Sequence, residues 1–317
     1  MKVLIADDDS VSRLLLERLL KAWGYEVVSA CDGMEASELL LDASPPRLAI
    51  LDWMMPGSTG PELCAQVRKH VGRPYTYLMM VTSRENKEDV INGLNAGADD
   101  YLTKPLHPQE LQARLRVGVR ILDLEDKLVA AQQVLLHKAT HDDLTGLLNR
   151  AAISELLRRE LARAPREKSA CGILLADLDH FKSVNDSLGH AAGDEVLREA
   201  AARLTAGVRD YDAVGRYGGE EFLLVLPGCD AAALRERADQ ILAAFRDRPF
   251  YAAGKPIRVT LSIGAVSSVE WRGATPRALV HSADVALYRA KHEGRDRVEV
   301  ALNDEIRESV IPPVMKL

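Results

Sequence analysis

The sequence predicts two domains: a doubly wound α/β domain with a five-stranded parallel sheet, joined by a long helix to an α+β domain with a mainly antiparallel sheet. The length of 317 residues suits about two domains. Within residues 2–103, short apolar runs alternate with amphipathic stretches, as in strands joined by crossover helices. In the second half this order changes, and two strand patterns meet at Gly218-Gly219, which indicates an antiparallel pair.

The composition is typical of a folded protein, with 47% hydrophobic, 28% charged and 5% aromatic residues. A formal charge of −6 excludes the broad positive field that duplex nucleic acid needs, so we expect no nucleic-acid partner. Apolar runs such as 48–55 are too short to span a membrane, and the N-terminus turns acidic at once. We therefore expect a cytoplasmic chain with no membrane span. The four cysteines lack the spacing of a zinc site.

In the first half, three runs are almost continuously apolar, as expected for strands covered by helices on both faces: Val3 to Ala6, Leu48 to Leu51 and Tyr77 to Val81. Between the first two runs lies an amphipathic stretch. Ser10 can cap this helix at its start, and Gly24 can end it.

Polar residues follow these strands: Asp7 and Asp8, then Asp52, Thr82 and Lys104. The carboxyl ends of parallel strands share one crevice, so these side chains should converge. Clustered carboxylates repel each other unless a divalent cation joins them, and oxygen ligands favour Mg²⁺. Asp52 could then attack phosphorus, Lys104 could pair with the added phosphoryl group, and the Thr82 hydroxyl could follow it. The alternative for any one acidic residue is loop solubility.

The motifs "IADDD", "LDWMMPG", "MVTS" and "YLTKP" resemble the receiver domain of two-component response regulators, over residues 1–122. The resemblance implies phosphorylation of Asp52 by a cognate histidine kinase or a small phosphodonor. It implies Mg²⁺ held by Asp8, Asp52 and the Met54 carbonyl, with Asp7 assisting. The implied switch residues are Thr82, Lys104 and Tyr101. Ser58-Thr59 departs from the usual pattern, which concerns loop shape alone.

A single long helix is predicted after Pro108, because residues 109–138 contain only one glycine, Gly118, and no proline. We assign 123–140 as a helical linker. One apolar stripe runs along it at spacings of three and four: Val117, Ile121, Leu124, Leu128, Ala131 and Leu135. This stripe could pair with a second copy and form a homodimer. The alternative is that it packs on its own domain.

The second domain is assigned to 141–301, followed by a tail at 302–317. Its predicted elements, in order, are a strand at Gly172 to Ala176, helical stretches, two strands around Gly218-Gly219, a helix from about Ala231, a strand at Ile257 to Ser262 and a helix near Arg277 to His292.

The segment "RYGGEEF" is the sharpest signal in the chain. Gly218 and Gly219 permit positive φ and close approach of a ligand. Glu220 and Glu221 would point to opposite faces on a strand, so at least one of them should serve a different role or be presented by the turn itself. Asp177 also follows an apolar strand, and Asp177 with Glu220 could hold one or two Mg²⁺ ions beside a nucleoside triphosphate. The alternative is a plain hairpin with solvated glutamates.

Five further residues suit a guanine nucleotide. Lys182 could neutralise charge that develops on the phosphates. Lys291 and Arg295 could clamp the outer phosphates, although basic residues at a helix C-terminus are also favoured by the dipole alone. Asn185 and Asp194 offer the amide and carboxylate that a guanine edge requires. The alternative for these two is helix capping.

These residues lie within the motifs "DLTGLLNR", "DLDHFKSVNDSLGHAAGDEVL", "RYGGEEF", "VTLSIG" and "ALYRAKHEGR", which jointly resemble the GGDEF-domain diguanylate cyclases. The resemblance implies Mg²⁺ at Asp177, the Leu178 carbonyl and Glu220. Glu221 would aid a second metal or deprotonate the 3′-hydroxyl, and Lys182 would stabilise the transition state. The remaining implied contacts are guanine at Asn185 and Asp194, and phosphates at His180, Phe181, Lys291 and Arg295, with Gly218 and Gly219 beneath the nucleotide.

Arg209 and Asp212 resemble the family's RxxD inhibitory site for its product. The following helix offers Arg235 or Arg237 as a further ligand, and the sequence leaves that choice open. A surface ion pair, which would contribute little, is the alternative.

The resemblance implies a homodimeric, phosphorylation-regulated diguanylate cyclase that condenses two GTP into cyclic di-GMP. A catalytically inactive cyclic di-GMP receptor that signals through the receiver domain is the alternative. A transcription factor is disfavoured because no helix-turn-helix or basic surface follows the receiver.

Overall fold

The computed structural model describes residues 1–70, 72–83, 87–270 and 275–301. Its contacts divide the chain into two compact units, with the boundary between Gln133 and Val134. The expected tail at 302–317 lies outside the described residues. No helix in the described ranges combines the length and apolar character needed to cross a membrane.

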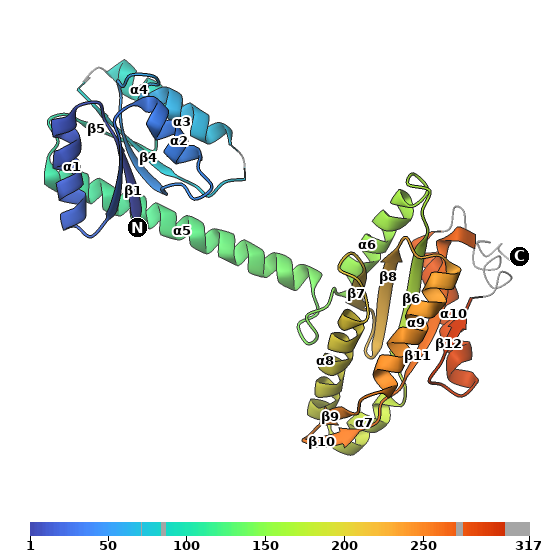
Figure 1. Ribbon diagram of the computed structural model, residues 1–317. Coiled ribbons are helices and arrows are strands. Elements are labelled where there is room, and N and C mark those ends of the chain that lie inside the picture. Colours follow the sequence, from blue (N-terminus) through green and yellow to red (C-terminus); the bar gives the residue numbers. More distant parts are fainter. Residues whose placement is uncertain (71, 84–86, 271–274, 302–317) are drawn as a thin grey trace, which may run out of the picture. The chain divides into compact units, whose positions relative to one another are not determined.

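The first unit is a five-stranded parallel sheet in the order β2-β1-β3-β4-β5 (Figure 1), as predicted. Its strands are β1 (Lys2–Ala6), β2 (Glu26–Ala30), β3 (Leu48–Asp52), β4 (Tyr77–Thr82) and β5 (Asp100–Thr103). The helices are α1 (Ser10–Ala22), α2 (Gly33–Leu41), α3 (Gly60–Lys69), α4 (Lys87–Asn95) and α5 (Pro108–Thr140). Apolar side chains of α1 and α5 cover one face of the sheet, and those of α2 and α3 cover the other.

The first helix is capped by Asp9 and not by Ser10, which is already its first residue. The Asp9 carboxylate accepts hydrogen bonds from the backbone amides of Val11 and Ser12. The prediction was wrong by one residue because aspartate and serine are equally good caps and the chain offers both in succession. Gly24, with φ of +85°, follows the end of the helix as expected.

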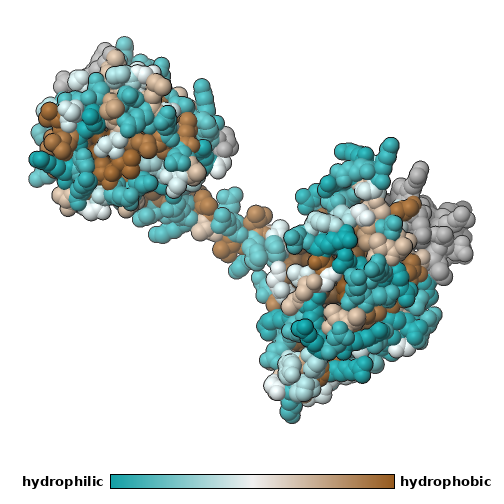
Figure 2. Space-filling model, in the orientation of Figure 1, coloured by the Kyte–Doolittle hydropathy of each residue, from teal (hydrophilic) through white to brown (hydrophobic). Residues whose placement is uncertain are grey.

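The side chains that helix α5 buries are not those of the apolar stripe identified in the sequence. Leu111, Leu115 and Leu122 are buried against the receiver sheet. All six stripe residues are exposed, with Leu128 and Leu135 at 63% and 67%, and Figure 2 shows exposed hydrophobic residues along this helix. The alternative in which the stripe packs on its own domain is therefore wrong. An exposed apolar stripe on a helix is a typical dimerisation face.

The second unit has a mainly antiparallel five-stranded sheet in the order β12-β11-β6-β8-β7, in which only β11 and β12 are parallel neighbours (Figure 1). Its strands are β6 (Cys171–Leu178), β7 (Ala213–Arg216), β8 (Glu221–Pro227), β11 (Leu261–Ser267) and β12 (Val298–Val300), with a separate pair β9 (Phe250–Ala252) and β10 (Lys255–Ile257). The helices are α6 (Arg150–Arg163), α7 (Phe181–Leu188), α8 (His190–Ala206), α9 (Ala231–Arg246), the 3₁₀ turn η1 (Ser268–Glu270) and α10 (Pro276–His292). Helices α8 and α9 cover one face, and α6 and α10 cover the other.

The strand predicted at Ile257 to Ser262 is misplaced. One short strand ends at Ile257, and the sheet strand β11 begins only at Leu261. The Thr260 carbonyl and hydroxyl between them are both hydrogen-bonded to Asp179. These hydrogen bonds come from a segment 81 residues away, and they lie where a stretch whose side-chain pattern alone is typical of one continuous strand is interrupted.

Candidate active site and phosphoacceptor site

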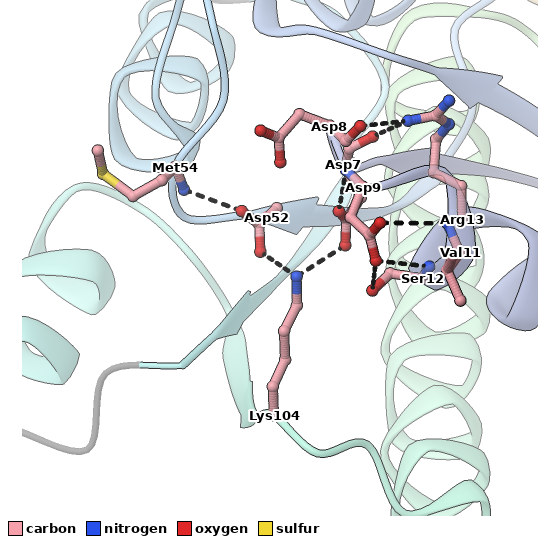
Figure 3. Close-up of polar contacts among 9 residues, drawn as sticks. All are labelled: Asp7, Asp8, Asp9, Val11, Ser12, Arg13, Asp52, Met54 and Lys104. Carbon is pink, nitrogen blue, oxygen red and sulfur yellow. Dashed lines mark hydrogen bonds and ion pairs between the residues drawn. The ribbon is translucent and has the colours of Figure 1, made fainter.

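The carboxylates of Asp7, Asp8 and Asp52 meet at the carboxyl edge of the receiver sheet, where one oxygen of each lies within 4.8 Å of the others. Lys104 reaches between two of them: its Nζ lies 2.7 Å from Asp52 Oδ1 and 2.9 Å from Asp7 Oδ2 (Figure 3). The Met54 amide donates to Asp52 Oδ2 at 3.1 Å. Four of the residues expected here are thus in contact or close together, as the strand-end argument predicts.

Burial raises the pKa of Asp52, and the charge of Asp7 raises it further, while the Lys104 ammonium lowers it. Burial by itself would lower the pKa of Lys104, but pairing with Asp52 and Asp7 outweighs it, so the pKa is raised. Two carboxylates contact the Lys104 ammonium, and a third, that of Asp8, lies close to them. This donor set of clustered hard oxygens fits a divalent cation such as Mg²⁺.

Of the three expected switch residues, Thr82 and Tyr101 lie in the neighbouring strands β4 and β5, and Lys104 directly follows β5. Thr82 is buried at the end of β4, and its carbonyl accepts from the Lys104 amide at 2.8 Å. Tyr101 is half-buried in β5, with the Arg114 guanidinium 5.9 Å from its ring centre. Thr82 and Lys104 are therefore brought together beside Asp52.

In the second unit, the central strands β6 and β8 bring four expected residues to one end of the sheet. Asp177 is the direct partner of Glu221 in the ladder. The next residue, Leu178, donates its amide to the Glu220 carbonyl at 3.3 Å. Glu221 is the first residue of β8, whereas Glu220 belongs to the connecting turn. Of the two alternatives left open by the sequence, presentation of a glutamate by the turn itself holds for Glu220.

Asp177 is the buried member of this acidic group, with 6% of its surface exposed. Its Oδ2 lies 2.8 Å from the Nζ of Lys291, in the last turn of α10. Burial raises the pKa of Asp177 to about 6; Lys291 lowers it, and the charges of Glu220 and Glu221 raise it further. The negative charges of Glu220 and Glu221 thus act on Asp177, and a divalent cation bound among these carboxylates would relieve that repulsion.

The two glycines of the turn act differently from the expectation. Neither has positive φ. At Gly218 a side chain would meet Glu221, because a Cβ would lie 2.3 Å from its Oε2. At Gly219 there is open space. A side chain at Gly218 would thus displace the flexible end of Glu221, whereas at Gly219 it would meet no other atom, so glycine there leaves the surface bare for a ligand.

The turn between β7 and β8 comprises residues 217–220, so it is longer than the expected two-residue turn. The Arg216 side chain fixes this turn by hydrogen bonds. Its Nε and Nη2 donate to the Gly219 carbonyl at 3.0 and 2.8 Å, and its Nη1 lies 3.1 Å from Asp142 Oδ1. The sequence reasoning gave neither residue a role. Their only signal was position: Arg216 begins the motif "RYGGEEF", and Asp142 directly precedes the motif "DLTGLLNR".

Helices α7 and α8 bring the expected guanine-reading pair together. Asn185 lies inside α7 and Asp194 inside α8, so the alternative that they only cap helices is wrong. A Cβ on Gly193 would lie 1.9 Å from Asn185 Oδ1. The Asn185 amide therefore packs on the backbone one residue before Asp194. Sequence reasoning did not identify Gly193, whose lack of a side chain permits this contact.

The expected phosphate residues surround the same end of the sheet. His180 is the N-cap of α7 in a left-handed conformation, Phe181 is buried and Lys182 is exposed. Arg295 is exposed in the turn after α10, with φ of +64°. Lys291 contacts Asp177 directly. It lies in the last turn of α10, and Arg295 lies in the turn that follows, so both basic residues lie at the end of one helix.

The RxxD residues line a cavity of about 290 Å³ between Arg209, Asp212 and helix α9. Arg237 also lines this cavity, whereas Arg235 pairs with Asp239 on the helix surface. Asp212 Oδ2 accepts from the Arg209 backbone amide at 2.9 Å. Arg237 is thus the arginine positioned beside the RxxD residues.

Comparison with protein families agrees with both units. The model described as "Diguanylate cyclase, GGDEF domain" matches residues 139–297, and that described as "Response regulator receiver domain" matches residues 3–116. The chain belongs to the GGDEF family. Its GGDEF domain therefore carries the second site, and its receiver domain carries the first.

Curated relatives share these domains. Response regulator PleD of Caulobacter vibrioides is 32% identical over 299 residues, covering 94% of this chain and 65% of that protein. Diguanylate cyclase DgcP of Pseudomonas aeruginosa is 40% identical over 216 residues, covering 67% of this chain and 32% of that protein. The chain thus spans less than two thirds of either relative.

Among solved structures, the coiled coil and GGDEF domain of DgcB from Caulobacter crescentus, in complex with c-di-GMP, matches with a TM-score of 0.55 and 29% identity. The match covers 60% of this chain and 99% of that one.

Proposed function

We propose that this chain is a diguanylate cyclase regulated by its receiver domain. The observation that carries this proposal is the convergence of Asp177, Leu178, Glu220 and Glu221 at the adjacent ends of β6 and β8. In a GGDEF-family chain, that arrangement supplies the acidic site that the condensation of two GTP requires. The products are cyclic di-GMP and two pyrophosphates.

The residues divide the chemistry among them. Asp177, the Leu178 carbonyl and Glu220 would hold Mg²⁺, which when bound neutralises phosphate charge and favours ionisation of the attacking hydroxyl. Glu221 accepts the proton of the 3′-hydroxyl. The hydroxyl oxygen bonds to the α-phosphorus of the opposite GTP, and the bond to the bridging oxygen breaks, so that pyrophosphate leaves with the electron pair. Lys182 stabilises the charge that develops.

Substrate selection rests on helices α7 and α8. Asn185 and Asp194 face guanine, because a carboxylate can accept from N1–H and the exocyclic amine together. The phosphates lie over Gly219, which has no side chain. They are surrounded by His180, Phe181, Lys291 and Arg295. GTP is therefore the proposed substrate.

Two copies are needed, since each GTP supplies a hydroxyl to the other and one domain holds one nucleotide. The exposed stripe on α5, with Leu128 at its centre, is the proposed dimer contact. Phosphorylation of Asp52 by a cognate histidine kinase or small phosphodonor shifts the population of dimer geometries. Mg²⁺ for that step would be held by Asp8, Asp52 and the Met54 carbonyl, with Asp7 assisting.

Product inhibition is proposed at the cavity beside Arg209, Asp212 and Arg237. Arginine guanidinium groups pair with phosphate, and the Asp212 carboxylate can accept from a guanine edge. Bound cyclic di-GMP would then limit its own synthesis.

The test is incubation of the full chain with GTP and Mg²⁺, with and without beryllofluoride as a phosphate mimic, and chromatography of the products. Cyclic di-GMP should appear, more of it with the mimic, and the mimic should have no effect on Asp52→Asn. Glu220→Ala should lose turnover by a factor of about 100 or more, whereas the surface variant Glu155→Ala should not. Binding of cyclic di-GMP without any turnover, even with the mimic, would instead identify an inactive receptor.

A further inference from the structure

Asp179 directly follows the two residues proposed to bind metal, Asp177 and Leu178, but its carboxylate is engaged in other hydrogen bonds. It is buried, with 4% of its surface exposed. Its carboxylate accepts from Ser262 Oγ at 2.7 Å, from Thr260 Oγ1 at 2.7 Å and from the Asp296 amide at 3.1 Å. Burial of a carboxylate is costly unless donors surround it, and here three donors do so.

Two of these partners belong to the start of β11 and the stretch before it. The Asp179 amide also donates to the Thr260 carbonyl at 2.9 Å, so that backbone and side chain both join this stretch. Ser262 is completely buried. The Asp179 carboxylate therefore adds side-chain hydrogen bonds between the end of β6 and the start of β11, next to the ladder pair of Leu178 and Leu261.

The third partner lies in the turn after α10, which carries Arg295. Three successive residues have positive φ there: Gly294 at +119°, Arg295 at +64° and Asp296 at +50°. Arg295 and Asp296 are not glycines, and a left-handed conformation costs each about 1 kcal/mol. Such a turn persists only where its surroundings hold it.

Several contacts hold this turn. The Arg295 amide donates to the Ala290 carbonyl at 2.9 Å, and Arg246 Nε lies 2.9 Å from Asp296 Oδ1. Among the contacts described, the Asp179 carboxylate is the one that joins the turn to the end of β6. It therefore relates the proposed phosphate clamp to the proposed metal-binding residues.

We infer that Asp179 is a positioning residue: its hydrogen bond to the Asp296 amide sets where Arg295 stands relative to Asp177 and Leu178, and thereby tunes binding of the triphosphate. This inference rests on the proposed function of the same site. Asp179 touches no substrate. Its effect passes through Arg295, which is exposed and free to meet the outer phosphates.

The test is a double-mutant cycle of Asp179→Asn and Arg295→Ala, read by calorimetric binding of a GTP analogue with a methylene group between the α- and β-phosphorus atoms. Each single variant should weaken binding of this analogue about tenfold. The double variant should be no weaker than Arg295→Ala alone, because both changes remove the same contact. Binding of GMP, which lacks the outer phosphates, should be unchanged in Asp179→Asn. The exposed variant Asp239→Asn should bind both nucleotides as the wild type does.

Additive losses in the double variant, equal weakening of GMP and the GTP analogue, or no loss in Asp179→Asn would each overturn the inference. If Asp179→Asn does not fold, the Thr260→Val variant provides the test. It removes one hydrogen-bond donor to Asp179 and keeps the carboxylate. Binding of the GTP analogue should then weaken by less than in Asp179→Asn, and binding of GMP should be unchanged. Unchanged or unselective binding in Thr260→Val would then overturn it. Turnover of GTP by the wild type is measured in parallel, so that failure of the proposed function is seen separately from failure of the coupling.

Discussion

Arg216 grips the carbonyl oxygen of Gly219 through two guanidinium nitrogens, at 3.0 and 2.8 Å. The third nitrogen of the same group reaches both oxygens of Asp142. One planar side chain thus joins the turn that carries Glu220 to the segment that directly follows helix α5. Lysine cannot reproduce this arrangement, because its ammonium is a point charge without a fork.

Arg216→Lys should therefore lower the turnover number about tenfold or more, since the position of the Glu220 turn is no longer fixed. The KM for GTP should change much less, because the proposed guanine contacts on α7 and α8 are untouched. Steady-state kinetics on GTP measures both values. The matched control is Arg158→Lys, in an exposed pair on α6. An unchanged turnover number would show that the turn keeps its shape without this grip.

The stability of the GGDEF domain should depend on pH through Asp142. Burial alone would raise the pKa of this carboxyl, but hydrogen bonds from Thr145 and pairing with Arg216 outweigh burial, so the pKa is lowered. A lowered pKa means that the ionised group stabilises the fold above the pKa of the unfolded chain, and that this contribution is lost as the pH falls through the folded value.

Asp142→Asn should accordingly reduce the free energy of unfolding by about 1 to 2 kcal/mol at neutral pH. The difference from the wild type should shrink as the pH falls from about 5 toward 2, where both proteins lack the charge. Urea unfolding across that range measures it. Asp143→Asn, at the exposed neighbouring position, is the control. A difference that stays constant with pH would contradict the prediction.

Leu128→Glu should weaken dimer formation roughly thirtyfold, because a charge in an apolar seam costs about 2 kcal/mol. Turnover should fall at low protein concentration and recover as the concentration rises. The thermal stability of the separate domains should not change, since Leu128 is 63% exposed. Analytical ultracentrifugation gives the dissociation constant. Val129→Glu, exposed but outside the stripe, should have little effect; equal effects of the two variants would refute the proposed seam.

Arg237→Ala should relieve product inhibition, raising the inhibition constant of cyclic di-GMP about tenfold or more, as should Arg209→Ala. Both guanidinium groups line the same cavity. Arg235→Ala is a close control, because this neighbouring arginine pairs with Asp239 on the surface instead. Inhibition constants that respond to Arg235 and not to Arg237 would place the inhibitory site elsewhere.

Much of the fold followed from local patterns. The alternation of apolar runs and amphipathic stretches predicts the parallel sheet, and the rule that strand ends share one edge predicts the meeting of Asp7, Asp52 and Lys104. The Gly-Gly segment predicts the antiparallel pair β7 and β8. Errors arose where hydrogen bonds of particular side chains outweighed the pattern, as with the Asp9 cap and the interruption at Thr260.

The sequence by itself determined which chemical groups this protein carries and on which element each one lies, because periodicity and turn residues act over a few neighbouring positions. Apart from the groups at the strand ends, tertiary structure alone decided which groups meet across the chain: Asp142 with Arg216, Asp179 with Asp296, and Arg237 in place of Arg235 beside Arg209. Residues two apart on a helix point about 200° apart, so packing of α9 against the sheet selects one arginine for the cavity and leaves the other in solvent. Such choices depend on contacts between distant segments, which no local pattern contains.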